Sequence, residues 1–274
     1  EHDGIRFLQG EGVGIVTLPG LGLEIGGPAI NKTPRQMMET IVRRHYPVGV
    51  VDITISIPQG RELATKTFNA RLGILDGISV VGTSGVVKPF SSEAFIASIV
   101  RQADVAVALG ADTIVINSGA KSEKYLKAAF PDLPFQSFVQ YGNFIGETLE
   151  KLASLSIPKI YMGIMLGKAV KLAEGNMDTH SKKVVMNKAY LHTVATKAGC
   201  TDRAHTLIDG LTLARELWQG LSAEDLDRFM HQITESCHEA GARLVPESEL
   251  SVLLIDDEGN IRYTYPRDFF QANK

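Results

Sequence analysis

From about Arg71 onward the chain alternates short apolar strands with amphipathic helices, and this alternation limits the possible folds more than any other feature. Each helix follows its strand after a short connection, and several of the helices end at a glycine. Strands joined in this way run parallel in one sheet, with helices covering its faces. The expected strands are residues 78–81, 113–117, 135–141 and 159–162, followed by a terminal hairpin of residues 252–255 and 261–265.

The first seventy residues differ, because glycine, proline and isolated strands replace the regular alternation. A helix is expected to begin at Thr33, with Pro34 in its first turn, and to end before Pro47. Residues 50–57 alternate apolar and polar side chains, which is typical of a half-buried strand. We therefore predict an α/β chain with a smaller α+β N-terminal domain, residues 1–70, and a Rossmann-like parallel sheet domain, residues 71–274, that includes C-terminal helices and the hairpin.

Composition excludes several classes of function. The formal net charge is −3 and no run is rich in lysine and arginine, so nucleic acid is not an expected partner. The most apolar windows are interrupted by Asp52 and Asp112, so no membrane-spanning segment is expected. Cys200 and Cys237 are the only cysteines, which argues against a disulfide framework and a structural zinc site and favours the cytoplasm.

Small and polar residues follow the expected strands, at the sheet edge where parallel sheets bind ligands. Glycine allows a ligand to approach the backbone, and hydroxyl and amide groups offer hydrogen bonds. The alternative for each position is a tight turn without a ligand. The four positions are Gly82-Thr83-Ser84-Gly85, Asn117-Ser118-Gly119, Gly142-Asn143 and Gly163.

None of these segments matches a known phosphate-binding motif. The glycine-rich Gly10-Glu11-Gly12-Val13-Gly14 precedes a strand, whereas a dinucleotide-binding loop follows one. Asn117 also stands where a ribose-binding carboxylate would be needed. A nicotinamide-dependent enzyme therefore remains only an alternative, and the absence of a G-x-S-x-G elbow argues against a hydrolase.

Few side chains outside this edge suggest chemistry. His180 lies in a loop that could face the ligand edge, although a histidine bonded to backbone is the simpler interpretation. Lys168 and Lys171 could meet an anionic substrate or be surface charges. His231, Glu235 and His238 share one helix face at a spacing that could hold a metal, but a solvated face is favoured and no metal site is predicted.

Taken in order, the motifs resemble the CbiD family, the cobalt-precorrin-5B C(1)-methyltransferases of anaerobic cobalamin biosynthesis. The resemblance covers almost the whole chain. Members of the family usually carry a Gly/Thr/Ala-rich segment ahead of the equivalent of Gly10, so the N-terminal domain is expected to be incomplete at its start. The most specific motifs are Gly10-Glu11-Gly12-Val13-Gly14, Pro28-Ala29-Ile30-Asn31, Pro34-Arg35, Thr67-Phe68-Asn69, Arg71-Leu72-Gly73-Ile74, Gly82-Thr83-Ser84-Gly85, Asn143-Phe144-Ile145-Gly146, Gly167-Lys168 and Thr179-His180-Ser181.

The resemblance implies that the chain moves the methyl group of S-adenosylmethionine to C-1 of a cobalt-bearing tetrapyrrole. Methyl transfer from a sulfonium depends mainly on positioning, so most assigned residues bind. His180 is assigned to steer the reaction or accept a proton. The residues assigned to the methyl donor are Gly82, Thr83, Ser84, Gly85, Asn117, Gly119 and Asn143.

The substrate carries several carboxylate side chains, which arginine and lysine can pair. Cobalt arrives inside the substrate, so the protein needs no metal of its own. A corrinoid-binding scaffold without activity is the alternative from another class, and the sequence leaves a homo-oligomer open. The residues assigned to the substrate carboxylates are Arg35, Arg71, Lys88 and Lys168.

Overall fold

A computed structural model describes residues 4–82 and 91–272. The chain divides into two compact units, residues 1–110 and 111–274. This division lies later than the boundary expected between residues 70 and 71. Helix α3 (Ser92–Ala108) explains the difference, because its Val105 is fully buried in one cluster with Val16 and Leu72 of the first unit. Phe95 of the same helix also meets the Phe68 ring edge-on, with centroids 5.9 Å apart.

The first unit is built from short strands and tight backbone crossings. Strand β1 (Gly4–Gln9) pairs in parallel with β3 (Val50–Ile55), and β2 (Ile15–Val16) pairs antiparallel with β4 (Ile74–Leu75). The predicted helix is α1 (Lys32–His45), which begins one residue before Thr33. The remaining elements are α2 (Gly60–Ala64) and the 3-10 turn η1 (Asn69–Leu72).

Glycines permit these crossings. Gly12 has φ +75°, and a Cβ there would overlap the carbonyl oxygen of Ile57. A Cβ at Gly60 would in turn overlap the Gly12 carbonyl, and one at Gly77 would overlap it as well. Only glycine tolerates both the positive φ and the close backbone approach. The glycine-rich motif at residues 10–14 therefore serves backbone packing, which agrees with its rejection as a dinucleotide loop.

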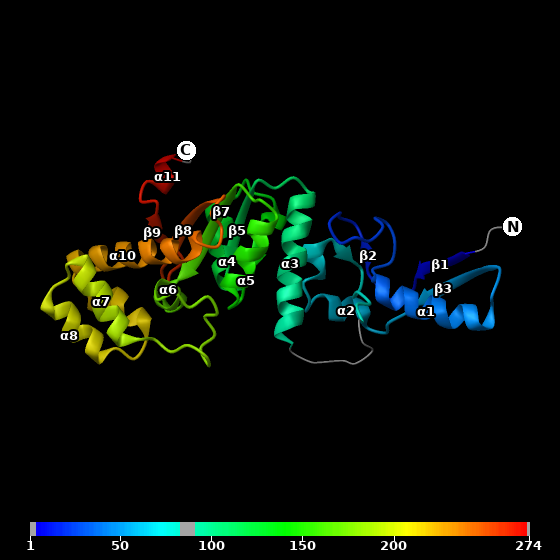
Figure 1. Cartoon of the computed structure of the whole chain (residues 1–274), viewed down its shortest axis with the longest axis horizontal. Helices are drawn as coiled ribbons and strands as arrows, with labels where there is room; N and C mark the ends of the chain where they lie inside the picture. Colours follow the sequence, from blue (N-terminus) through cyan, green and yellow to red (C-terminus); the bar gives the residue numbers. More distant parts are fainter. Residues whose placement is uncertain (1–3, 83–90, 273–274) are drawn as a thin grey trace. The chain divides into compact units, whose positions relative to one another are not determined.

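The second unit contains a five-stranded sheet of order β6-β5-β7-β8-β9, of which Figure 1 labels β5, β7, β8 and β9. Strands β5 to β8 are parallel, and β9 closes the edge as the antiparallel partner of β8. The strands that the sequence predicted are thus confirmed at 113–117 and in the hairpin. The strand bounds are β5 (Thr113–Asn117), β6 (Phe138–Gln140), β7 (Lys159–Met165), β8 (Glu249–Ile255) and β9 (Ile261–Tyr265).

Helices cover both faces of this sheet. On one face Leu126 of α4 and Phe269 of α11 pack with Val115, Tyr161 and Leu253 in a single cluster. On the other face α10 contacts α6 and β8. The helices of this unit are α4 (Ala120–Ala129), α5 (Ile145–Ser154), α6 (Leu166–Ala173), α7 (Lys188–Ala198), α8 (Asp202–Gly210), α9 (Leu217–Gly220), α10 (Ala223–Ala242) and α11 (Phe269–Ala272), with 3-10 turns η2 (Phe135–Ser137) and η3 (Ala214–Glu216).

One predicted strand does not belong to this sheet. Residues 78–81 form isolated bridges, Ile78 with Val13 and Val80 with Ile30, and so lie in the first unit. A second correction concerns Gly163, which lies inside β7 and not beyond its end. A Cβ at Gly163 would overlap the side chain of Leu126, so the glycine lets α4 pack closely on the sheet.

In the part of the chain that the structure describes, none of the helices has the length and apolar character of a membrane-spanning segment.

Candidate functional site

The strand order places a switch point between β5 and β7. The chain leaves β5 toward β6 on one side and then returns across β5 to form β7 on the other side. Helices on opposite faces then diverge from the carboxyl ends of these two strands, and parallel sheets bind ligands in the crevice formed there. The segments that follow the strand ends are Ser118-Gly119, Tyr141-Gly142-Asn143 and Leu166-Gly167-Lys168.

Lys168 lies at the centre of this edge. Its ammonium donates to the carbonyl oxygen of Gly142 at 2.6 Å, to Oδ1 of Asn143 and to Oγ1 of Thr179 at 3.5 Å. The side chain is half-buried, and no carboxylate of the described residues lies within ion-pair distance. Burial, followed by repulsion from Lys171, lowers the pKa of Lys168 to about 8, and Asp178 opposes the shift. A perturbed lysine in a ligand crevice is typical of functional sites.

The loop between α6 and α7 lies against the same edge. The amide of Ile145 donates to the carbonyl of Met177 at 3.0 Å, and the amide of Thr179 donates to the carbonyl of Asn143 at 3.0 Å. Lys171 adds a hydrogen bond from its ammonium to the carbonyl of Thr179 at 3.2 Å. The two motifs that the sequence separates by more than thirty residues, around Asn143 and around Thr179, are therefore adjacent.

His180 has one ring nitrogen already engaged. Its Nδ1 accepts from the amide of Lys182 at 3.1 Å, and its own amide donates to Asp178 at 3.0 Å. Asp178 also pairs with Lys183 at 2.6 Å. Burial acts to raise the pKa of this carboxyl, but the hydrogen bonds and charges of Lys183 and His180 together outweigh it and lower the pKa. Only Nε2 of His180 is therefore available to a substrate. The interpretation of a loop histidine bonded to backbone describes Nδ1 well.

Asn117 and Gly119 occupy the end of β5 in different ways. The Asn117 side chain is fully buried: its amide donates to the carbonyl of Val139 at 3.3 Å, and its oxygen accepts from the amide of Gly119 at 3.1 Å. Its polar groups thus connect the strands and the following turn. Gly119, in contrast, precedes α4 with open space where a Cβ would lie. Of the predicted donor residues, Gly119 and Asn143 share this sheet edge and remain candidates for contact.

The other predicted residues belong to the first unit or fall outside the described residues. Gly82 belongs to the first unit, where it is exposed. Arg71, also in the first unit, lies with its guanidinium 5.9 Å from the centre of the Phe68 ring. Thr83, Ser84, Gly85 and Lys88 lie outside the described residues.

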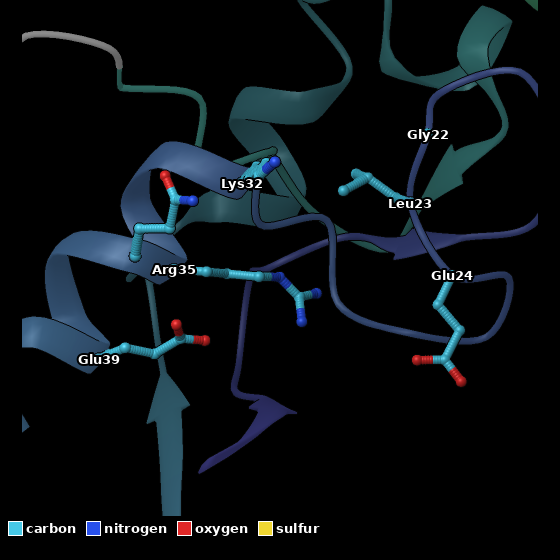
Figure 2. Close-up of a pocket in the computed structure, with 7 residues that line it drawn as sticks. Gly22, Leu23, Glu24, Lys32, Arg35 and Glu39 are labelled. Atoms are coloured by element: carbon cyan, nitrogen blue, oxygen red, sulfur yellow. The ribbon is translucent and has the colours of Figure 1, made fainter. Parts of the chain in front are cut away.

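Arg35 lines a separate cavity in the first unit, of about 380 Å³. Its Nε donates to the carbonyl of Ile30 at 2.8 Å, its Nη2 donates to that of Pro28 at 3.1 Å, and the guanidinium lies 4.9 Å from the centre of the Phe7 ring. Figure 2 shows this side chain extending from α1 toward the segment that carries Leu23 and Glu24. The cavity is lined by Gly22, Leu23, Glu24, Lys32, Arg35, Gln36 and Glu39.

Within the described residues, no group of three or more histidine, cysteine, aspartate or glutamate side chains could hold a metal. The helix face considered for a metal instead packs on aromatic rings. The His231 ring meets the Tyr263 ring edge-on at 5.0 Å, and the His238 ring lies 4.4 Å from that of Tyr265.

Comparison with known proteins identifies the family. The model of the CbiD family matches residues 1–89, and that of the CbiD C-terminal domain matches residues 178–266. A cobalt-precorrin-5B C(1)-methyltransferase of Prosthecochloris aestuarii is 38% identical over 256 residues, covering 92% of this chain and 69% of that protein. One from Variovorax paradoxus is 39% identical over 259 residues, covering 91% of this chain and 70% of that protein. The chain belongs to the CbiD family.

Among solved structures, the crystal structure of the cobalamin biosynthesis protein CbiD from Archaeoglobus fulgidus matches with 26% identity. The match covers 67% of this chain and 57% of that one, with a TM-score of 0.25. The family models and the curated relatives, rather than this structure, confirm the resemblance to the CbiD family that the sequence motifs indicated.

Sequence reasoning did not single out Thr179 and Gly142 as partners of Lys168. Thr179 was visible only as part of the Thr-His-Ser motif of the CbiD family. Nothing in a linear sequence connects it to Lys168, because the contact depends on how the loop after α6 folds back across the turn after β6.

Proposed function

We propose that this chain is an S-adenosylmethionine-dependent methyltransferase that methylates C-1 of cobalt-precorrin-5B to give cobalt-precorrin-6A. Two relatives that match this chain over most of its length are named cobalt-precorrin-5B C(1)-methyltransferase. The observation that best supports a site is the convergence of Asn143, Lys168 and Thr179 at the switch point of the parallel sheet. In a Rossmann-like arrangement this crevice would bind the methyl donor.

The open N-terminus of α4 favours the donor there. Gly119 leaves space before the helix, where backbone amides can donate to ribose or carboxylate oxygens. The amide of Asn143 adds a side-chain donor at the neighbouring strand end. The family motif alone supports contacts of the methyl donor with Gly82, Thr83, Ser84 and Gly85. Asn117 is proposed to support the turn that carries Gly119.

The chemistry requires little beyond this positioning. When bound, the donor supplies a methyl group whose bond electrons remain on sulfur, while the electron pair of C-1 forms the new carbon–carbon bond. The methylated ring then returns to its resting charge by losing one proton. Because Nδ1 of His180 accepts from the amide of Lys182, the neutral ring carries its hydrogen on Nε2. We propose that Nε2 donates a hydrogen bond that steers the substrate, while the proton released by the methylated ring passes to water.

Substrate recognition is assigned to the cations of the first unit. Arg35 has no ion-pair partner among the described residues, yet two carbonyls and an aromatic ring fix its guanidinium. A fixed, unpaired guanidinium is suited to a carboxylate. We assign Arg35, with Arg71 and Lys88, to acetate and propionate side chains of the tetrapyrrole.

Methyl transfer can be tested directly with S-adenosylmethionine labelled in its methyl group and cobalt-precorrin-5B. The expected result is one labelled methyl on the corrinoid and one equivalent of S-adenosylhomocysteine. Calorimetric titration of the chain with S-adenosylhomocysteine and with NADH separates the alternatives. If the chain bound the corrinoid but not S-adenosylhomocysteine, a scaffold without activity would be favoured. If it bound NADH in preference to S-adenosylhomocysteine, a nicotinamide-dependent enzyme would be favoured.

A further inference from the structure

Lys168 makes contacts that differ from those expected of a substrate-binding cation. An ammonium has three hydrogen atoms and no acceptor. Here three oxygen atoms of the protein surround it, from Gly142, Asn143 and Thr179. All its donor capacity is therefore directed at the protein, and none is left unpaired for a carboxylate.

These contacts reinforce a junction between two segments that backbone hydrogen bonds also join. Turn 142–146 and loop 176–183 share the bridge between Phe144 and Asp178 and the hydrogen bonds from Thr179 to Asn143 and from Ile145 and Gly146 to Met177. A Cβ at Gly146 would lie 2.9 Å from the Cβ of Met177, so the two backbones approach closely. Lys168 reaches across this junction from α6, which is a third segment.

The position is unfavourable for a cation on its own. Lys168 lies in the first turn of α6, where the helix dipole is positive, and Lys171 is a second cation on the same helix face. Half-buried charge in such a place persists only when hydrogen bonds compensate for the lost water. For Lys168, neutral oxygen atoms accept these hydrogen bonds. The bonds in turn fix the orientation of the groups that carry the oxygens.

Asn143 is the group most affected. Because Lys168 can only donate, the Asn143 amide must turn its oxygen toward the ammonium. Its NH2 group then faces away from Lys168, as a hydrogen-bond donor. Without the ammonium, the two ends of the amide could exchange places.

We infer that Lys168 is a positioning residue for methyl transfer, which clamps loop 176–183 to turn 142–146 and holds the Asn143 amide with its NH2 group presented to a hydrogen-bond acceptor of the methyl donor. This inference rests on the proposed function. It replaces the expectation that Lys168 pairs with a substrate carboxylate. The acceptor at Asn143 belongs to the ribose or adenine part of the donor, since both offer oxygen or nitrogen lone pairs.

Hydrogen exchange tests the clamp without reference to activity. In Lys168→Met, the amides of Ile145 and Thr179 should exchange at least about tenfold faster than in the wild type, while those of β5 and β7 keep their protection. Lys197→Met, which removes an exposed lysine of α7, serves as the control and should leave both amides unchanged. If Lys168→Met is poorly folded, Lys168→Gln replaces it. Unaltered exchange at both amides in the folded variant would overturn the clamp.

Kinetics test the orientation of Asn143. Asn143→Asp keeps an oxygen for Lys168 but removes the NH2 donor, so the two segments should stay protected while kcat/KM for S-adenosylmethionine falls about tenfold or more. Lys168→Met should lower the same kcat/KM with little change in KM for the tetrapyrrole, and Lys168→Arg should recover part of it. Normal kcat/KM in Asn143→Asp, or a change confined to the tetrapyrrole KM in Lys168→Met, would contradict the inference. A wild-type chain without methyl transfer would instead refute the proposed function, and the exchange experiment would still decide the clamp.

Discussion

The two units use their family motifs in different ways. In the first unit, Gly12 of the motif at residues 10–14 allows its backbone to cross that of Gly60, and Arg35 is fixed by carbonyls of its own neighbourhood. In the second unit, motifs far apart in the sequence converge on one sheet edge around Lys168. The glycine-rich motif around Gly12 therefore marks backbone packing, whereas the motifs around Lys168 mark polar contacts, and only the fold distinguishes the two.

The strongest test of this contrast is Gly12→Ala. The new Cβ would overlap the carbonyl oxygen of Ile57, which is backbone and cannot turn aside, and φ is +75°. We expect a loss of about 3 kcal/mol or more in the free energy of unfolding of the first unit, measured by denaturant titration.

Gly22→Ala is the matched control, because Gly22 also has a positive φ of +65° but has nothing within 4 Å of a Cβ. Its cost should be only about 1 kcal/mol, from the backbone conformation alone. Equal losses in the two variants would show that the crossing at Gly12 has no steric role.

A weaker effect is expected from Gly163→Ala in the second unit. Here the obstacle is the end of the Leu126 side chain, which can adopt another rotamer. The cost should be about 1–2 kcal/mol, from the displaced packing of α4. A loss as large as that of Gly12→Ala would remove the distinction between backbone and side-chain obstacles.

The regular part of the fold was predictable, and the irregular part was not. Residues 113–117 and the hairpin were found because apolar runs and turn residues are local signals. A serine at a helix start is another local signal: the Oγ of Ser222, the N-cap of α10, accepts from the amide of Asp225 at 3.2 Å. Residues 78–81 carry the same local pattern as a sheet strand, yet they bridge Val13 and Ile30, because tertiary pairing is not encoded in the pattern of one segment.

The site shows the same limit. The sequence assigned both Asn143 and Asn117 to the methyl donor from their positions after strands, but it could not show that the Asn117 side chain is buried and hydrogen-bonded to Val139 and Gly119. Residue type and position after a strand do not determine the direction of a side chain. The neighbours Val139 and Gly119 determine it here, and only the folded chain brings Val139 close.

Arg35→Ala tests whether the cavity of the first unit has a chemical role as well as a structural one. We expect KM for the tetrapyrrole to rise about tenfold with kcat nearly unchanged, because a carboxylate partner is lost in both ground and transition states. Arg61→Ala, which removes an exposed arginine of α2, is the control. If the stability of the first unit fell while KM stayed constant, Arg35 would belong with Gly12 as a packing residue.

The smallest expected effect is a pH dependence that sets the clamp apart from folding stability. The pKa of Lys168 is lowered to about 8 by burial and then by Lys171, from an ordinary value of 10.5. Between these values the folded protein has lost a proton that the unfolded chain retains, so this group makes folding more favourable as pH rises.

The clamp formed by Lys168, however, weakens over the same pH range, because the neutral amine has one hydrogen-bond donor fewer than the ammonium. We expect kcat/KM for S-adenosylmethionine to fall by up to roughly fivefold between about pH 8 and pH 9 without loss of stability from this group. In Lys168→Arg the guanidinium keeps its charge, so the decline should move to higher pH. If kcat/KM for S-adenosylmethionine declined over the same pH range in Lys168→Arg as in the wild type, the decline would belong to another group.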